Sequence, residues 1–195
     1  LVQQTTDDSR VKVIKHKVNL GVGAAVITGY KEAVKDNADV VVKLDGDGQM
    51  NPDLIIDFIN PIINETADYC KGNRFFNLEK IKSMPTIRII GNAILSFLNK
   101  LSSGYWNLFD PNNGFTAINA DLINYLPLGK ISQRYFFESD MLFRLNTLRA
   151  VAIDIPMNAS YGDEKSNLKI RSILFEFLWK HNTNFVKRIF YNYYL

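Results

Sequence analysis

The feature that most constrains the fold is the segment 40–55, VVVKLDGDGQMNPDLI, in which an apolar run ends at a pair of aspartates. A short apolar run bounded by turn residues is typical of a parallel strand that is buried on both faces. Asp45 and Asp47 follow the run directly, and their negative charges repel each other. Ligands of open α/β sheets bind beyond the carboxyl ends of the strands. The segment therefore predicts a ligand site at a sheet edge, where another group compensates the two charges.

The segments around this strand alternate between strand and helix periodicity. We expect strands at 10–16, 38–44 and 67–75, and helices at 19–37 and 51–65. This order is typical of right-handed crossover units in a parallel sheet. The first half of the chain therefore predicts an α/β layer of the nucleotide-binding kind.

The second half is mixed. Its periodicity predicts helices at 83–101 and 136–148, and strands at 113–120 and 150–156. We expect one α/β domain over residues 1–166, with a mostly parallel central sheet and helices on both faces.

The segment 167–195 differs in composition from the rest of the chain. It interleaves eight aromatic residues with basic residues: Phe175, Phe177, Trp179, Phe185, Phe190, Tyr191, Tyr193 and Tyr194, with Lys169, Arg171, Lys180, Lys187 and Arg188. Basic amphipathic helices with aromatic residues suit a membrane interface. The alternative is a helix that simply packs on the domain. The polar stretch 181–184, HNTN, favours two helices over one.

Composition excludes several classes of protein. One cysteine, Cys70, rules out an internal disulfide framework, and its place in an expected strand indicates a buried thiol. A net charge of +3 is too small to indicate nucleic-acid binding. No apolar run is long enough to cross a membrane, and no signal peptide is visible. The start of the sequence lacks a leading strand, so we expect a piece of a longer protein.

Asp45 and Asp47 form a compact, oxygen-rich site for a divalent cation. Mg²⁺ prefers one or two carboxylates together with water and substrate phosphates, and Gln49 would add a neutral oxygen. A calcium loop is excluded, because its sixth and twelfth positions, which require Gly and Glu, are Met50 and Ile56. A plain Asp-Gly turn without a ligand is the competing interpretation.

Several motifs, in order along nearly the whole chain, resemble family 2 glycosyltransferases, particularly the dolichol-phosphate mannose synthase-like branch. They are VKVIKHKVNLGVGAAVITGYKEA (11–33), VVVKLDGDGQMNPDLI (40–55), KGNRF (71–75), DPNNGFTAINADLI (110–123), FFESDML (136–142) and YGDEKSNLKI (161–170). Each motif alone is weak, whereas the ordered set is specific. The resemblance implies a GT-A fold, a nucleotide-diphosphate sugar donor, and Mg²⁺ or Mn²⁺ bridging the diphosphate to the protein.

The resemblance also assigns roles by position. The metal and diphosphate motif matches Asp45, Gly46, Asp47 and Gln49. Positive charges for the diphosphate come from Arg74, from Arg88 and from Lys165 in the late loop. The acceptor side matches Asp110, Gly114 and Phe115. Glu138 and Asp140 are the candidate acids that would take a proton from a hydroxyl acceptor, and the alternative is that they only begin a helix.

Two positions depart from the family pattern. The family opens with a strand that ends in Asp-Asp-Gly-Ser, whereas this chain has Val2, Gln3 and Gln4 in the corresponding place. Either the loop lies upstream of this sequence or donor binding is impaired. The branch also has an arginine before the glycine of its late loop, where this chain has Ala159.

We therefore expect a metal-dependent, inverting hexosyltransferase at the cytoplasmic face of the membrane, with polyprenyl phosphate as the acceptor. One alternative is transfer to a saccharide hydroxyl in surface polysaccharide or glycan synthesis. Another is a catalytically silent module that binds a nucleotide or a membrane. Homo-oligomers are compatible with the sequence, and nucleic acid is not an expected partner.

Overall fold

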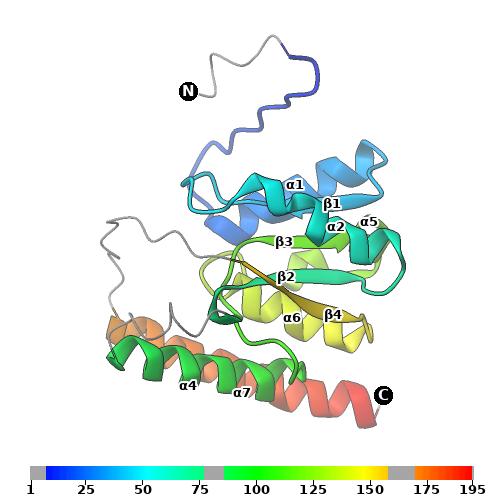
Figure 1. The fold of residues 1–195 in the computed structure, drawn as a ribbon. Coiled ribbons are helices and arrows are strands. Elements are labelled where there is room, and N and C mark those ends of the chain that lie inside the picture. Colours follow the sequence, from blue (N-terminus) through cyan, green and yellow to red (C-terminus); the bar gives the residue numbers. More distant parts are fainter. Residues whose placement is uncertain (1–7, 77–85, 158–169, 195) are drawn as a thin grey trace.

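The structure of the chain is a computed structural model that describes residues 8–76, 86–157 and 170–194 (Figure 1). Helices and strands follow each other in the order α1 (Val22–Lys35), β1 (Val40–Lys43), η2 (Pro52–Leu54), α2 (Ile55–Ile63), β2 (Tyr69–Asn73), η3 (Arg74–Phe76), α4 (Thr86–Ser103), β3 (Thr116–Asn119), α5 (Ala120–Tyr125), η4 (Leu128–Lys130), α6 (Phe137–Thr147), β4 (Ala152–Pro156) and α7 (Ile170–Tyr193).

The strands form a four-stranded sheet in the order β1-β3-β2-β4. β3 pairs antiparallel with both β1 and β2, while β2 pairs parallel with β4. β1, β2 and β4 therefore run in one direction and β3 runs opposite to them. The expectation of a mostly parallel sheet holds for the direction of these three strands. It is wrong for the pairing, because β3 lies between β1 and β2 and makes both of its ladders antiparallel.

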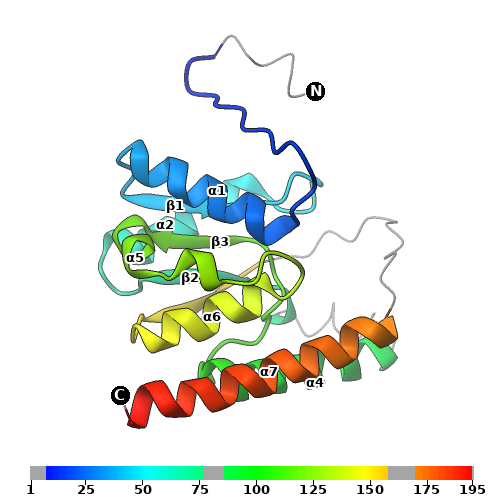
Figure 2. The same ribbon diagram turned by 180° about the vertical axis from the view of Figure 1, so that it is seen from behind.

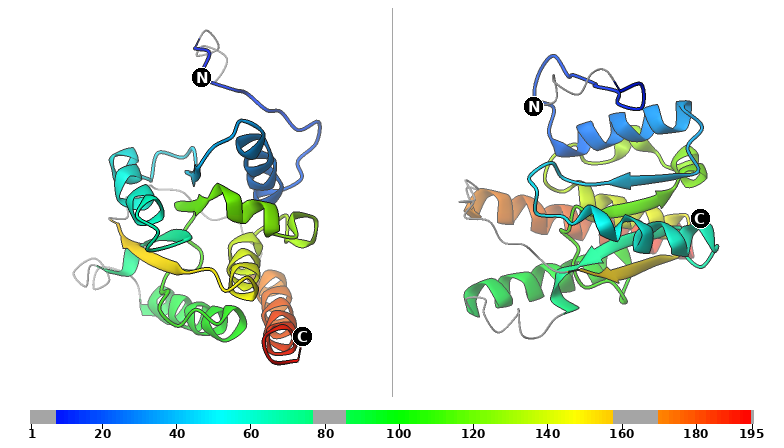
Figure 3. Two further views of the ribbon diagram at one scale, coloured as in Figure 1. Left: turned by 90° about the vertical axis from the view of Figure 1, so that its right-hand side faces the viewer. Right: turned by 45° about the horizontal axis from the view of Figure 1, so that its top comes forward.

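Helices cover both faces of the sheet, as the α/β pattern predicts (Figure 3). Successive residues of a strand point to opposite faces. Ile118 of β3 accordingly belongs to a core with residues of α1, α5 and α6, whereas its neighbour Ala117 belongs to a second core with residues of α2. Cys70 lies fully buried in the second core. The sheet is thus sealed on both sides, and its strand ends remain for a ligand site.

The helix expected at 51–65 is confirmed as η2 followed by α2. Asn51 is its N-cap, because its side chain accepts a hydrogen bond from the backbone N–H of Asp53 at 3.0 Å. Pro52 holds the first helical position, where a missing N–H costs nothing. Pro61 lies inside the helix, which continues to Ile63.

The strand expected at 10–16 is absent: residue 10 lies in a turn, residues 11–16 have no regular secondary structure, and Val11 and Val13 are exposed. A strand requires a partner, and within the described residues the sheet ends at β1. β1 is thus an edge strand of the described sheet. All four of its residues are half-buried, so the expectation of a strand buried on both faces is wrong. A groove of about 850 Å³ lies beside it, lined by Val40, Val42 and apolar residues of α2.

α7 is a single helix, so the expected break at 181–184 is wrong. It lies beside α4 beyond β4 and α6, and the pair forms the base of the molecule (Figures 1 and 2). The polar residues of this stretch dock the helix instead of ending it. His181 Nδ1 lies 2.7 Å from Ser102 Oγ, and Asn184 Nδ2 donates to Asp140 at 3.0 Å. No helix in the described residues is apolar and long enough to traverse a bilayer.

Candidate active site

Several of the predicted site residues come together at one edge of the sheet. β1, β2 and β4 end at this edge and β3 begins there, because β3 runs opposite to the others. Asp45 follows β1, Arg74 follows β2, and Gly114 precedes β3 by two residues. The edge therefore gathers polar side chains from segments that are far apart in the sequence.

Lys43 compensates the charge of the first aspartate. Its Nζ lies 3.0 Å from Asp45 Oδ1 and 3.4 Å from Glu138 Oε1, so one ammonium joins two carboxylates. The Lys43 side chain is 9% exposed and the Glu138 side chain is 12% exposed, whereas the Asp45 side chain is 38% exposed. The ion pair thus connects the buried start of α6 with the open turn that follows β1.

The turn itself presents oxygen atoms to solvent. Asp47 is exposed, and its Oδ1 accepts a hydrogen bond from the backbone N–H of Gln49 at 3.0 Å. Gly46 lies between the aspartates and is exposed as well. No cluster of three or more acidic, histidine or cysteine side chains that could hold an ion occurs in the described part of the chain. The aspartate pair fits Mg²⁺ or Mn²⁺, since such ions take few carboxylates and leave other positions to phosphate and water.

Gly114 packs directly on the ion pair. A Cβ atom at this position would lie 2.1 Å from Asp45 Oδ2 and 2.6 Å from Lys43 Nζ. Any side chain here would displace the Asp45 carboxylate. The next residue, Phe115, is fully buried, and its ring stacks on Phe58 with centroids 3.9 Å apart. Its position accounts for packing between β3 and α2, and its predicted contact with an acceptor stays a prediction.

Arg74 and Asp110, predicted separately for donor and acceptor, bind each other. Arg74 Nε and Nη2 donate to the two carboxylate oxygens of Asp110 at 2.7 and 2.9 Å. The Arg74 backbone N–H also donates to Asp110, which is 1% exposed. Such a bidentate pair fixes the guanidinium plane. The structure therefore places a rigid positive group where β2 ends.

Two charged residues near this edge, one buried and one half-buried, were not predicted. Lys71 of β2 is fully buried, its Nζ donates to the carbonyl of Asn113, and burial lowers its pKa to about 8. Asp154 of β4 accepts from Asn73 Nδ2 and from the Phe109 backbone N–H, and burial raises its pKa to about 6. A sequence signal for Lys71 existed: a lysine stands near the end of an apolar strand in DYCKGN, as Lys43 does in VVVKL.

Asp140 behaves as a structural residue of the described chain. Its carboxylate accepts from the Ser132 backbone N–H at 2.8 Å and from Asn184 Nδ2 at 3.0 Å, and Arg144 Nε lies 3.8 Å away. These contacts tie α6 to the preceding loop and to α7. A role for Asp140 in proton transfer stays a prediction.

Two further predicted residues have no described side chain. Arg88 lies in the first turn of α4, but its side chain is outside the described residues, and Lys165 lies wholly outside them. The same is true of Ala159 and of the first seven residues, which hold Val2, Gln3 and Gln4.

Comparison with known sequences identifies the family. Residues 1–126 match the model of glycosyl transferase family 2. Over 154 residues the chain is 35% identical to the UDP-N-acetylglucosamine–dolichyl-phosphate N-acetylglucosaminyltransferase of Methanococcus voltae, covering 79% of this chain and 61% of that protein. It is 28% identical over 155 residues to the undecaprenyl-phosphate mannosyltransferase of Micrococcus luteus, covering 79% and 63%. The chain thus spans about three fifths of the length of these relatives.

Solved structures agree in fold. Glucosyl-3-phosphoglycerate synthase from Mycobacterium tuberculosis, crystallised with Mn²⁺, UDP-glucose and glycerol 3-phosphate, superposes with a TM-score of 0.54 at 16% identity. The match covers 92% of this chain and 57% of that protein. At this identity the likeness concerns the fold alone, and it agrees with the GT-A expectation. The match over residues 1–126 establishes that the chain belongs to glycosyl transferase family 2.

Proposed function

We propose that the protein transfers a hexose from a nucleotide-diphosphate sugar to a polyprenyl phosphate, with inversion at the anomeric carbon. The observation that carries the proposal is the convergence of Asp45, Asp47 and the Arg74–Asp110 pair at one sheet edge. Two relatives named for transfer to dolichyl or undecaprenyl phosphate support the acceptor class. A structural neighbour crystallised with Mn²⁺ and UDP-glucose supports the donor class.

In this reaction an acceptor oxygen forms a bond to the anomeric carbon, while the bond to the diphosphate oxygen breaks. The electron pair of the broken bond leaves with the nucleoside diphosphate. Bound Mg²⁺ or Mn²⁺ would supply charge neutralisation for that leaving group, held by Asp45, Asp47 and Gln49. Arg74 would add a fixed positive charge at the same edge, since Asp110 holds its guanidinium plane.

The surroundings of the candidate bases favour a phosphate acceptor over a hydroxyl. A hydroxyl must lose a proton, so it needs a carboxylate free to accept one. Asp140 is engaged with Ser132 and Asn184, and Glu138 is paired with Lys43. A polyprenyl phosphate is already ionised and needs no such base. This consideration ranks transfer to a saccharide hydroxyl second.

The Asp47→Asn variant tests the reaction. Asn keeps the size of the side chain and removes the charge, and Asp47 is exposed, so we expect an unchanged unfolding midpoint. We expect metal-dependent sugar transfer to polyprenyl phosphate to fall by about 100-fold or more. Asp53→Asn, an exposed acid in η2, is the matched control. Near-normal transfer by Asp47→Asn would exclude the metal role of the pair.

We further propose that α4 and α7 rest on the cytoplasmic face of a membrane. α7 turns three polar residues toward the domain and leaves most of its aromatic residues exposed, although Phe177 packs on Phe136 and Glu176 lies at the surface. The inner side bears His181, Asn184 and Arg188, which bind Ser102, Asp140 and the Leu101 carbonyl. The outer side bears a stripe at helical spacing: Phe175, Trp179, Val186, Phe190 and Tyr193, which are 44–76% exposed.

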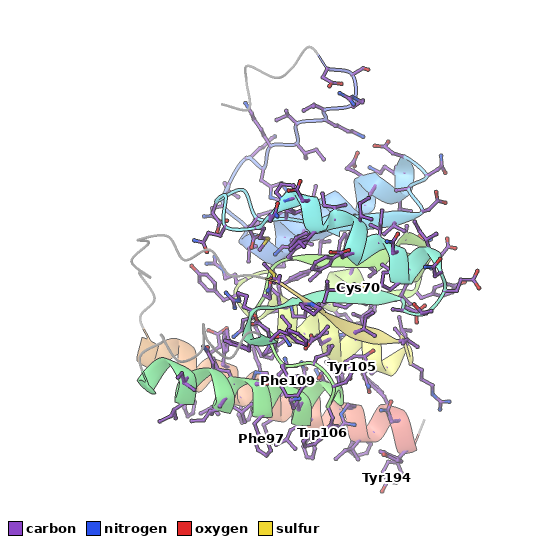
Figure 4. The ribbon with its side chains drawn as sticks, viewed as in Figure 1. Cys70, Phe97, Tyr105, Trp106, Phe109 and Tyr194 are labelled. Atoms are coloured by element: carbon purple, nitrogen blue, oxygen red, sulfur yellow. The ribbon has the colours of Figure 1, made fainter. Side chains whose placement is uncertain are left out.

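α4 and the loop after it extend this apolar surface. Ile90, Ile94 and Phe97 lie at helical spacing on α4 and are 52–53% exposed. Trp106 lies edge-on to Phe97 with ring centroids 6.4 Å apart. Figure 4 shows Phe97 and Trp106 beneath α4 and Tyr194 at the end of α7, on the side away from the sheet. An exposed apolar surface of this extent marks an interaction site.

The charges of the two helices favour an anionic membrane as the partner. Across α4 and α7 the sequence holds six basic residues and one acidic residue, Glu176. Aromatic rings at headgroup depth with adjacent cations suit anionic lipid, and the cytoplasmic leaflet carries that charge. A membrane location would also place the enzyme beside a lipid acceptor.

Vesicle flotation tests the membrane proposal. The double variant Trp179→Ser with Phe190→Ser removes two exposed rings of α7 and leaves its inner polar contacts intact. We expect binding to vesicles of phosphatidylcholine with phosphatidylglycerol to fall by about tenfold or more, at about 25 cal/mol per Å² of apolar surface. Tyr125→Ser, a 73% exposed ring on α5, is the control and should bind as the parent does. Equal binding by all three proteins would refute the proposal, and a dimer broken by the double variant would assign the surface to a second copy.

A further inference from the structure

We propose that Lys43 is an electrostatic gate on the metal site: it occupies Asp45 while the donor is absent, so that the cation binds strongly only together with a nucleoside diphosphate. This inference rests on the proposed function of the aspartate pair. Lys43 would be a positioning residue, since it acts through Asp45 and not on the substrate. Neither the sequence motifs nor the family match assigns it a role.

Lys43 forms ion pairs with two carboxylates. Its ammonium lies between Asp45 of the metal-binding turn and Glu138 of α6, at 3.0 and 3.4 Å. Its side chain comes from the last residue of β1 and is 9% exposed. Gly114 packs closely against the ammonium, because a Cβ atom at Gly114 would lie only 2.6 Å from Lys43 Nζ. The ammonium is therefore confined to the immediate neighbourhood of the two carboxylates.

This placement makes Lys43 and a bound cation competitors. One carboxylate oxygen of Asp45 already has a positive partner, and a divalent ion beside it must overcome repulsion from the ammonium. Glu138 offers that ammonium a second partner, so Lys43 keeps a counter-ion when a cation takes Asp45. The diphosphate of a donor adds negative charge on the far side of the cation and offsets the repulsion.

The surroundings support a role in charge balance over a role in packing. Lys71, a second buried lysine, lies on β2 at the same edge and donates to the Asn113 carbonyl. The edge thus contains two lysines of low exposure, while Asp47 faces solvent and forms no ion pair with a lysine or arginine of the described residues. Asp45 and Asp47 accordingly differ: the first is neutralised by the protein and the second is left for the ligand.

Titration of Mn²⁺ alone, followed by electron paramagnetic resonance of the free ion, tests the gate. The measurement uses the full chain as it is encoded, with and without UDP or GDP. Lys43→Gln removes the competing charge, and we expect it to bind Mn²⁺ without nucleotide about tenfold more tightly than the parent. Lys43→Arg keeps the charge and should bind within about twofold of the parent. Glu138→Gln leaves the ammonium to Asp45 alone and should bind about threefold more weakly.

The test is decisive because Lys43→Gln should bind Mn²⁺ more tightly than the parent, whereas Glu138→Gln should bind it more weakly. Weaker binding by Lys43→Gln, or equal binding by all variants, would overturn the gate. If Lys43→Gln does not fold, as judged by circular dichroism, the Glu138→Gln and Lys43→Arg results still decide. Failure of the proposed function has a different signature, because then the parent would bind no Mn²⁺ even with a nucleoside diphosphate, and Asp47→Asn would change nothing.

Discussion

Replacing Gly114 by alanine should disable the site while leaving the fold almost intact. The added Cβ would lie 2.1 Å from Asp45 Oδ2, whereas contacts of a real Cβ stay above 3.0 Å. The carboxylate must therefore retreat by about 1 Å, and a displacement of that size in a catalytic group costs about 100-fold in rate. The Asp45 side chain is 38% exposed, so it has open space to turn into. We expect the free energy of unfolding to fall by only about 1 kcal/mol.

The assay compares kcat for sugar transfer with the urea unfolding midpoint of the same preparation. Gly29→Ala is the matched control, because a Cβ at Gly29 meets nothing within 4 Å and the residue lies inside α1. It should keep full activity and gain about 0.5–1 kcal/mol in stability from helix propensity. If Gly114→Ala transfers sugar at the parent rate, the close packing of Gly114 on Asp45 has no functional meaning. If its loss of activity only tracks unfolding, the glycine serves the fold.

Two further predictions concern stability. His181 is 3% exposed and burial lowers its pKa to about 4, so between pH 6.5 and 4 the unfolded chain binds a proton that the folded chain does not. Stability should therefore fall as the pH drops through this window, by up to about 3 kcal/mol, and His181→Gln should lose this dependence in urea unfolding at stepped pH. Asp154, with its pKa raised to about 6, acts in the opposite direction in both proteins, so only the difference between them is diagnostic. Arg74→Met leaves the buried Asp110 without its two guanidinium donors and should cost about 3 kcal/mol in addition to activity, whereas Asp47→Asn should cost activity alone. An Arg74→Met protein as stable as the parent would show that the pair does not support the fold.

Local chemistry along the chain predicted much of what the structure contains. The periods of apolar residues gave α1, α2, β2, α4, β3, α6 and β4 close to their observed bounds. The Asn51 cap was visible as well, because it depends on residues adjacent in sequence. The aspartate pair was placed at the end of a strand on the same basis, and the family resemblance named its chemistry.

Contacts between distant segments decided the rest. Lys43 lies 95 residues from Glu138, and no spacing in the sequence pairs them. β3 lies between β1 and β2, so the pairing in both of its ladders differs from the predicted parallel pairing. The strands themselves were predicted, but a strand pattern does not specify which strands are neighbours. The strand pattern at 10–16 likewise did not specify a neighbour, and these residues pair with no strand of the described sheet.

α7 shows most clearly what the sequence determined and what the tertiary structure decided. Its sequence predicted amphipathic helices with a break at 181–184, and helical spacing fixes only which residues share a side of a helix. Periodicity does not say which side faces the protein. The tertiary structure decided this through Ser102 and Asp140, whose buried polar groups require hydrogen-bond partners and find them in His181 and Asn184. The side that bears His181 and Asn184 therefore turned inward, and most of the aromatic residues were left exposed.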